Sequence, residues 1–136
     1  MKIKVDISVG ELLDKISILK IKCNKIEDEE KLSYVKAELL DLVTCATSSG
    51  VYDESLLSEI QIVNETLWDI EDEIRILEKN KDFSTEFVNL ARSVYITNDE
   101  RFEIKSRINE KYGSMIREQK QYTDYGSSKT NNHEEV

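Results

Sequence analysis

The sequence predicts an all-α protein that folds as one domain. Proline is absent from its 136 residues and glycine occurs only four times, whereas sheet proteins rely on both residues for their turns. Leucine and isoleucine recur at alternating spacings of three and four, the pattern of helices that pack along a heptad seam. We therefore predict an antiparallel helical bundle or coiled-coil hairpin over residues 1–122 and a disordered polar tail over residues 123–136.

The first seven residues alternate between apolar and polar side chains, with Ile3, Val5 and Ile7 on one side. Such alternation predicts a short strand or extended arm. A single strand is not stable alone, so we expect the arm to lie against a helix or to pair with a second copy of the chain.

Two helices are predicted next, joined by a turn. Ser8 caps the first helix, and Glu11 is placed to complete a capping box. Its seam consists of Val9, Leu12, Ile16, Leu19, Cys23 and Ile26. The seam changes phase across residues 27–30, which predicts a turn with Asp28 as the N-cap of a second helix that ends near Ala46, before Gly50.

The third predicted helix has the longest seam, three heptads between an N-cap at Asp53 or Ser55 and a basic end at residues 79–81. The seam consists of Leu56, Ile60, Val63, Leu67, Ile70, Ile74 and Leu77. Residues 53–82 hold ten acids and three bases, a local charge of -7 in a chain of net charge -9. Nucleic acids and anionic membranes need clustered bases, so we predict neither as a partner.

Two shorter helices are predicted after the third. The first covers about residues 85–96. Asn98 or Asp99 then caps a second helix that ends before Gly113, and a weaker helical stretch continues the pattern to Gln121.

Apolar residues beside the seams exceed what three helices can cover. They are Leu13, Ile18, Ile21, Leu57, Ile62 and Ile76. This surplus predicts self-association, most simply as a two-fold homodimer.

Location and cofactors are constrained by what the sequence lacks. Neither a secretory signal nor an apolar run long enough to span a bilayer is recognisable, so we expect a cytoplasmic protein. Two cysteines and the single His133 are too few for a zinc site, and no glycine-rich loop could cradle a cofactor's phosphates. We predict no metal and no cofactor.

A first group of polar side chains lies on one flank of the third helix. Asn64, Trp68, Glu71 and Arg75 fall within about 60° on a helical wheel. The tryptophan offers a stacking face and the arginine offers bidentate recognition of an anion, so the stripe could face a ligand. The alternative is a packing contact in which Glu71 and Arg75 form an i,i+4 ion pair.

A second polar group follows in the two shorter helices, and it consists of Arg92, Tyr95, Asn98, Asp99, Arg101 and Lys105. If Asn98 or Asp99 begins a helix, the free amides of that terminus and the three nearby cations could receive a phosphate or carboxylate. The alternative is that the two polar residues only cap the helix and the bases pair with acids of the third helix.

Enzymatic signatures are weak. All-α pyrophosphohydrolases place paired acids on neighbouring helices around magnesium. Here Glu27 and Glu30 fall in the predicted turn, and Asp69 with Asp72 has no second pair. A chorismate-mutase-like site would need only arginine and lysine converging inside a helical dimer, and the spacing gives it little support.

Three stretches, residues 8–22, 67–75 and 91–109, resemble the small bacterial family known as domain of unknown function 6165. The most specific are the runs Trp-Asp-Ile-Glu-Asp from Trp68 and Thr-Asn-Asp-Glu-Arg from Thr97, and the resemblance covers about residues 3–125. It implies no activity. It does imply a set of motif positions: Asp14, Lys15, Trp68, Glu71, Arg75, Arg92, Tyr95, Asn98, Asp99, Arg101 and Lys105.

The leading hypothesis is therefore a homo-oligomeric binding or adaptor module whose polar patch takes a protein partner or a small anionic ligand. The alternative is a small all-helical enzyme that acts on a phosphorylated or carboxylated metabolite, either pyrophosphohydrolase-like or mutase-like. In that enzyme the basic residues of both polar groups would clamp the anion, and Glu71 or Asp99 would act as an acid–base group or metal ligand. The sequence identifies no catalytic residue.

Overall fold

The computed structural model describes residues 1–126, and within this range the chain is all-α, with four helices and no strand. The helices are α1 (Val9–Lys25), α2 (Glu29–Ser48), α3 (Glu54–Lys79) and α4 (Thr85–Lys111). The predicted all-α class is therefore confirmed. Most of the predicted polar tail, from residue 127 onward, lies outside the described residues.

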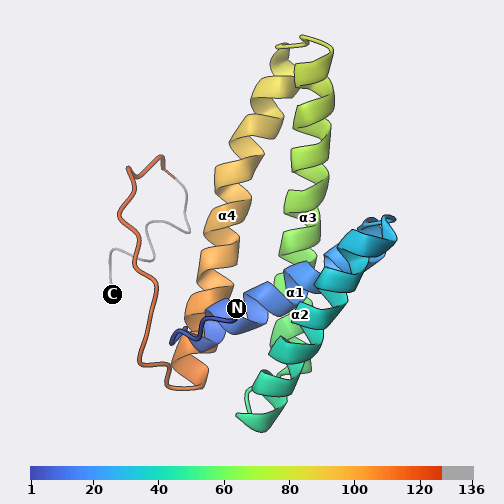
Figure 1. Cartoon of the computed structure of the whole chain (residues 1–136). Coiled ribbons are helices and arrows are strands. Elements are labelled where there is room, and N and C mark those ends of the chain that lie inside the picture. Colours follow the sequence, from blue (N-terminus) through green and yellow to red (C-terminus); the bar gives the residue numbers. More distant parts are fainter. Residues whose placement is uncertain (127–136) are drawn as a thin grey trace.

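Two long helices, α3 and α4, lie side by side, and the chain reverses direction in the turn that joins them (Figure 1). The shorter α1 crosses both of them toward one end and contacts every other helix. α2 turns back from the end of α1 (Figure 1). The C-terminal part of α3 and the N-terminal part of α4 extend together beyond this crossing, up to the turn that joins them (Figure 1).

Three of the predicted N-caps are confirmed, and α4 begins at Thr85, as predicted. Ser8 Oγ accepts a hydrogen bond from the Glu11 amide at 3.0 Å, and carboxylates of Asp28 and Asp53 cap α2 and α3 in the same way. Each of these side chains satisfies an amide that has no partner inside its helix. Glu11 does not complete a capping box, because its carboxylate instead accepts a hydrogen bond from Lys105 Nζ at 2.8 Å.

The predicted break in the C-terminal region is wrong. α4 runs without interruption through Asn98 and Asp99, so neither residue begins a helix. Asn and Asp are favoured at N-caps, but tertiary contacts override such local preferences, and here Thr97 and Ile104 are buried in the middle of the segment. α4 ends at Lys111, and residues 112–126 contain no helix, so the weak helical stretch predicted to Gln121 is also absent.

The hydrophobic core lies where α1 crosses α3 and α4. It consists of Leu12, Leu13, Ile16, Ala46, Leu57, Ile60, Ile104 and Ile108. In α3 the buried residues all lie in the first half, from Leu57 to Asn64, and in α4 they lie in the second half, from Thr97 to Asn109. The core therefore occupies one end of the α3–α4 pair, and any site formed at the crossing lies at its edge.

The first seven residues form neither helix nor strand, and they are exposed. Lys2 Nζ lies 3.0 Å from an Asp41 carboxylate oxygen on α2, an ion pair at the surface. The strand that the alternating pattern predicts is not formed within the chain. No helix among residues 1–126 is long and apolar enough to cross a membrane.

Candidate functional site

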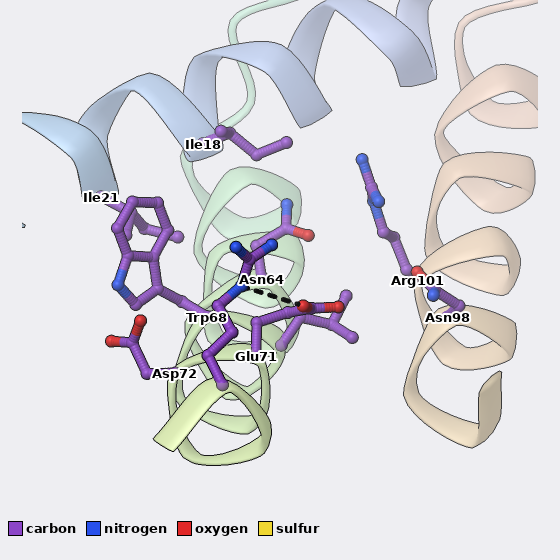
Figure 2. A pocket seen from close by; sticks show the side chains of 10 residues that line it. Ile18, Ile21, Asn64, Trp68, Glu71, Asp72, Asn98 and Arg101 are labelled. Carbon is purple, nitrogen blue, oxygen red and sulfur yellow. Dashed lines mark ion pairs between the residues drawn. The ribbon is translucent and has the colours of Figure 1, made fainter. Parts of the chain in front are cut away.

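A cleft of about 560 Å³ opens beside the core, between α1, α3 and α4 (Figure 2). Its lining residues are Ile18, Ile21, Asn64, Leu67, Trp68, Glu71, Asp72, Arg75, Asn98 and Arg101. Pockets that hold small ligands usually measure about 300–1,000 Å³ and combine an apolar wall with a few polar groups. The cleft has both properties.

The inner wall of the cleft is a buried polar network that joins three helices. Asn64 Nδ2 of α3 donates to Asp14 Oδ1 at 2.9 Å and to Ser17 Oγ at 2.7 Å, both on α1. From α4, Arg101 reaches the same carboxylate with two nitrogens, Nε to Oδ1 at 2.8 Å and Nη2 to Oδ2 at 2.5 Å. Asp14 and Ser17 are fully buried, whereas the Arg101 side chain is 28% exposed.

This network fixes the guanidinium of Arg101 at the edge of the cleft. The two parallel hydrogen bonds to Asp14 raise the pKa of Arg101 above its ordinary value, and they hold its plane in one orientation. A buried carboxylate is tolerated only when its oxygens are paired, and here both oxygens are. Arg101 therefore stabilises the fold and also presents its outer edge to the cleft.

The position of α1 over α4 depends on a close backbone contact at Gly10. A Cβ at this position would lie 2.6 Å from the Lys105 carbonyl oxygen, so no larger residue fits without displacing a helix. The Gly10 amide donates to Asn109 Oδ1 at 2.7 Å, and the Val9 amide donates to Ser114 Oγ at 3.2 Å. Side chains from the last turn of α4 and from the segment just after it thus satisfy the first amides of α1 and hold α1 against α4.

The outer wall of the cleft comes from α3. Trp68 is partly buried and lies beside Ile21 of α1, with the Asp72 carboxylate next to it (Figure 2). Arg75 Nε lies 3.8 Å from a Glu71 carboxylate oxygen, and the Arg75 side chain is largely exposed. The i,i+4 ion pair that the sequence offered as an alternative is therefore present, and both of its members line the cleft.

A second, smaller cavity of about 230 Å³ shares Asn98 and Arg101 with the cleft. Its base is Lys105, whose side chain is only 7% exposed. Lys105 Nζ lies 2.8 Å from a Glu11 carboxylate oxygen and 3.5 Å from one of Glu118. Arg101 thus lines both the cleft and the second cavity.

The structure brings six of the ten predicted site residues into one cleft: Asn64, Trp68, Glu71, Arg75, Asn98 and Arg101. Lys105 belongs to the second cavity.

The remaining three predicted site residues, Arg92, Tyr95 and Asp99, line neither cavity. The Tyr95 ring packs against Tyr125 with centroids 5.0 Å apart, and the Tyr125 hydroxyl donates to Asp99. Because α4 is continuous, the amide-rich helix start expected at Asn98 does not exist. The expectation that the bases pair with acids of the third helix is wrong for Arg101, whose partner is Asp14 of α1.

Asp14 and Ser17 are absent from the two polar groups that the sequence analysis selected. A signal for them exists, because Gly10, Asp14, Ser17 and Ile21 are spaced by 4, 3 and 4 residues and form a stripe parallel to the leucine seam. Its first three residues are small or polar, where a core face is usually apolar. It marks the face of α1 that meets α3 and α4.

Among residues 1–126, no group of three or more histidine, cysteine, aspartate or glutamate side chains is placed to hold a metal ion.

Comparison with known proteins identifies one relationship. A family model described as a family of unknown function (DUF6165) matches residues 3–134, nearly the whole chain. No curated protein and no solved structure matches the chain. The protein belongs to the family of unknown function DUF6165.

Proposed function

We propose that this member of the DUF6165 family is a binding module that holds a small molecule with a ring and an anionic group in the cleft between α1, α3 and α4. One observation carries the proposal. A tryptophan and two arginines, Trp68, Arg75 and Arg101, line the same cleft, and one of the arginines is held in place by a buried carboxylate.

The side chains of the cleft suit different parts of such a ligand. The Trp68 ring offers an apolar face for stacking. Arg101 uses Nε and Nη2 on Asp14, and within residues 1–126 no hydrogen bond engages its Nη1, which leaves donors for a carboxylate or phosphate oxygen. Glu71 and Asp72 can accept hydrogen bonds from amine or hydroxyl groups of the ring.

The cleft is polarised from one wall to the other. The α3 wall carries Trp68, Asp72 and the ion pair of Glu71 with Arg75, whereas Asn98 and Arg101 face it from α4 (Figure 2). Acids and bases are balanced among the lining residues, so the cleft does not act as a general anion trap. This arrangement favours a ligand with hydrogen-bond donors on its ring and one anionic group at the other end.

A fluorescence titration tests the proposal, because Trp68 is the only tryptophan of the chain. We expect nucleoside monophosphates or aromatic carboxylates to change Trp68 emission with saturation, and the matching uncharged nucleosides or amides to bind about tenfold more weakly or worse, since a hydrogen bond to a charged group contributes about 1.5–3 kcal/mol. Arg75→Ala should weaken binding, while Arg92→Ala, an exposed arginine outside the cleft, should not. The absence of saturable change with every member of the panel would refute the proposal.

Assembly as a homodimer, and a protein partner beyond it, remain predictions from the sequence. Three of the surplus apolar residues, Leu13, Ile21 and Leu57, are buried within the chain, so they no longer support self-association. Ile62 and Ile76 on α3 are exposed and still support it. Light scattering on the wild type and on Ile62→Glu/Ile76→Glu tests the dimer. A wild-type monomer at micromolar concentration would contradict it. The cytoplasm likewise remains the location that the sequence predicts.

The enzymatic alternative is favoured by one observation, the presence of Arg75, Arg101 and Glu71 in a single cleft. Under this alternative the arginines would bind the anion and the carboxylate would exchange a proton with the substrate. Incubation of the protein with the same nucleotides and carboxylates, followed by product analysis, distinguishes turnover from binding. If a ligand saturates the change in Trp68 fluorescence but is recovered chemically unchanged, the protein binds the ligand without turning it over, and the enzymatic alternative fails.

A further inference from the structure

The second cavity contains a buried cation whose role the binding proposal does not use. Lys105 is nearly inaccessible at the base of the cavity, and Arg101 and Lys120 contribute two further cations to its lining. Phe102 forms another part of the wall, with Lys120 Nζ 5.5 Å from the centre of its ring. The cavity is thus more basic than the cleft beside it.

Two carboxylates meet Lys105, and they are held differently. Glu11 lies on α1 and accepts a hydrogen bond from Lys105 Nζ at 2.8 Å. Glu118 comes from the segment after α4, lies 3.5 Å away, and its side chain is 37% exposed. The Glu11 side chain is similarly exposed, at 35%, so the two contacts differ in length: that with Glu11 is a short charge-assisted hydrogen bond, whereas that with Glu118 is a longer and weaker ion pair. Glu118 can therefore turn into solvent while Lys105 keeps its partner on α1.

We propose that the second cavity is an anion subsite of the same ligand-binding site, which the Glu118 carboxylate occupies until a ligand replaces it. The inference rests on the proposed function of the cleft and extends it to the class of ligand. A ligand that extends from the cleft past Arg101 into the second cavity needs two neighbouring anionic groups, such as those of a nucleoside diphosphate. The first group binds Arg101, and the second binds Lys105 and Lys120.

The geometry of α4 supports a ligand of this kind. Arg101 and Lys105 are four residues apart on one helix, so their positions differ by about one turn, or roughly 5.4 Å along the axis. Consecutive phosphoryl groups, or carboxylates on neighbouring carbons, can contact both. A single anionic group at Arg101 leaves Glu118 in place.

The side chains on either side of Glu118 make contacts of their own. Arg117 Nε donates to the Ser114 carbonyl oxygen at 2.8 Å, and Lys120 lies over the Phe102 ring. In the exchange that we propose, the Glu118 side chain turns away and Lys120, which already lies over Phe102, binds the incoming anion.

The test compares adenosine diphosphate with adenosine monophosphate, using Trp68 fluorescence as the readout. In the wild type we expect the diphosphate to bind more tightly. Glu118→Gln removes the competing charge and should tighten diphosphate binding about two- to fivefold, the effect of one partly exposed ion pair, without changing monophosphate binding. Lys120→Met should weaken diphosphate binding alone. Glu86→Gln, the same change at an exposed position in the first turn of α4, is the control for net charge.

Three results would overturn the inference. Equal binding of both nucleotides, with no effect of Glu118→Gln on either, would remove the subsite while leaving the cleft as a binding site. Lower thermal stability of Glu118→Gln with unchanged diphosphate affinity would assign Glu118 a structural role only. If neither nucleotide, nor inorganic pyrophosphate in a thermal-shift measurement, bound saturably, the subsite would fail, whereas the cleft proposal would fail only if the aromatic carboxylates did not bind either.

Discussion

Loss of Arg101 should destabilise the protein more than loss of its partner Asp14. In Arg101→Met the Asp14 carboxylate stays fully buried, and among side chains only Asn64 Nδ2 still donates to it. Removing one partner of a buried ion pair typically costs about 3–5 kcal/mol, because the other charge is left uncompensated. Against a total stability on the order of 5–15 kcal/mol, this is a large fraction.

The reverse substitution should be milder. In Asp14→Asn the shape of the side chain is kept, and the Arg101 guanidinium, which is partly exposed, can turn toward water. We expect a loss of about 1.5–3 kcal/mol, the contribution of one hydrogen bond to a charged group. In the double variant Asp14→Asn/Arg101→Met no charge is buried. The double variant should therefore be more stable than Arg101→Met alone.

Urea unfolding followed by circular dichroism measures all three variants, with Arg92→Met as the matched control. Arg92 lies on the same helix and is exposed, so its loss should change stability by no more than about 0.5 kcal/mol. If Arg101→Met and Arg92→Met had equal midpoints, or if the double variant were the least stable of the set, the buried network would not hold the three helices as described.

Further predictions concern other parts of the structure. Gly10→Ala places a Cβ against the Lys105 carbonyl oxygen and should cost about 1–3 kcal/mol in thermal unfolding; a melting temperature equal to that of wild type would contradict the close contact of α1 and α4. Hydrogen bonds from Lys111 and Tyr112 lower the pKa of Asp53 below its ordinary value of 3.8. A lowered folded pKa means that the contribution of Asp53 is complete at neutral pH and is lost as pH falls below about 4 toward the folded value. Asp53→Asn should therefore be less stable than wild type at neutral pH, and the difference should shrink in acid; a constant difference across pH would contradict the role of its charge. Arg75→Ala should leave stability within about 0.5 kcal/mol of wild type, because its side chain is exposed; a larger loss would indicate a structural role instead of a ligand-binding one.

Local rules predicted the helices where short-range signals agree with one another. The start of α3 at Asp53 and its end near Lys79 followed from a cap, a heptad seam and a basic last turn, all within one stretch of chain. The same rules failed at Asn98, because the side chains there resemble a cap and nothing nearby in the sequence reveals that Thr97 and Ile104 are buried against other helices. Contacts between distant segments override weak local preferences.

The candidate site was predicted in the same partial way. Trp68, Glu71 and Arg75 could be grouped because they lie on one face of one helix. The partner of Arg101 could not, since Asp14 is 87 residues away in sequence and the charge pattern offered the acids of α3 as nearer candidates. The stripe through Gly10, Asp14 and Ser17 indicates a polar contact face on α1. The sequence does not show which helix packs against this face, so the partner of Asp14 could not be predicted.

The central claim, that a ligand bridges Trp68 on α3 and Arg101 on α4, is tested most directly by nuclear magnetic resonance. The single indole N–H belongs to Trp68, and the Arg101 Nε–H, protected by Asp14, can be identified by its loss in Arg101→Lys. During titration with adenosine monophosphate both signals should move along one saturation curve. A titration that saturates elsewhere on the protein while these two signals stay fixed would contradict the claim.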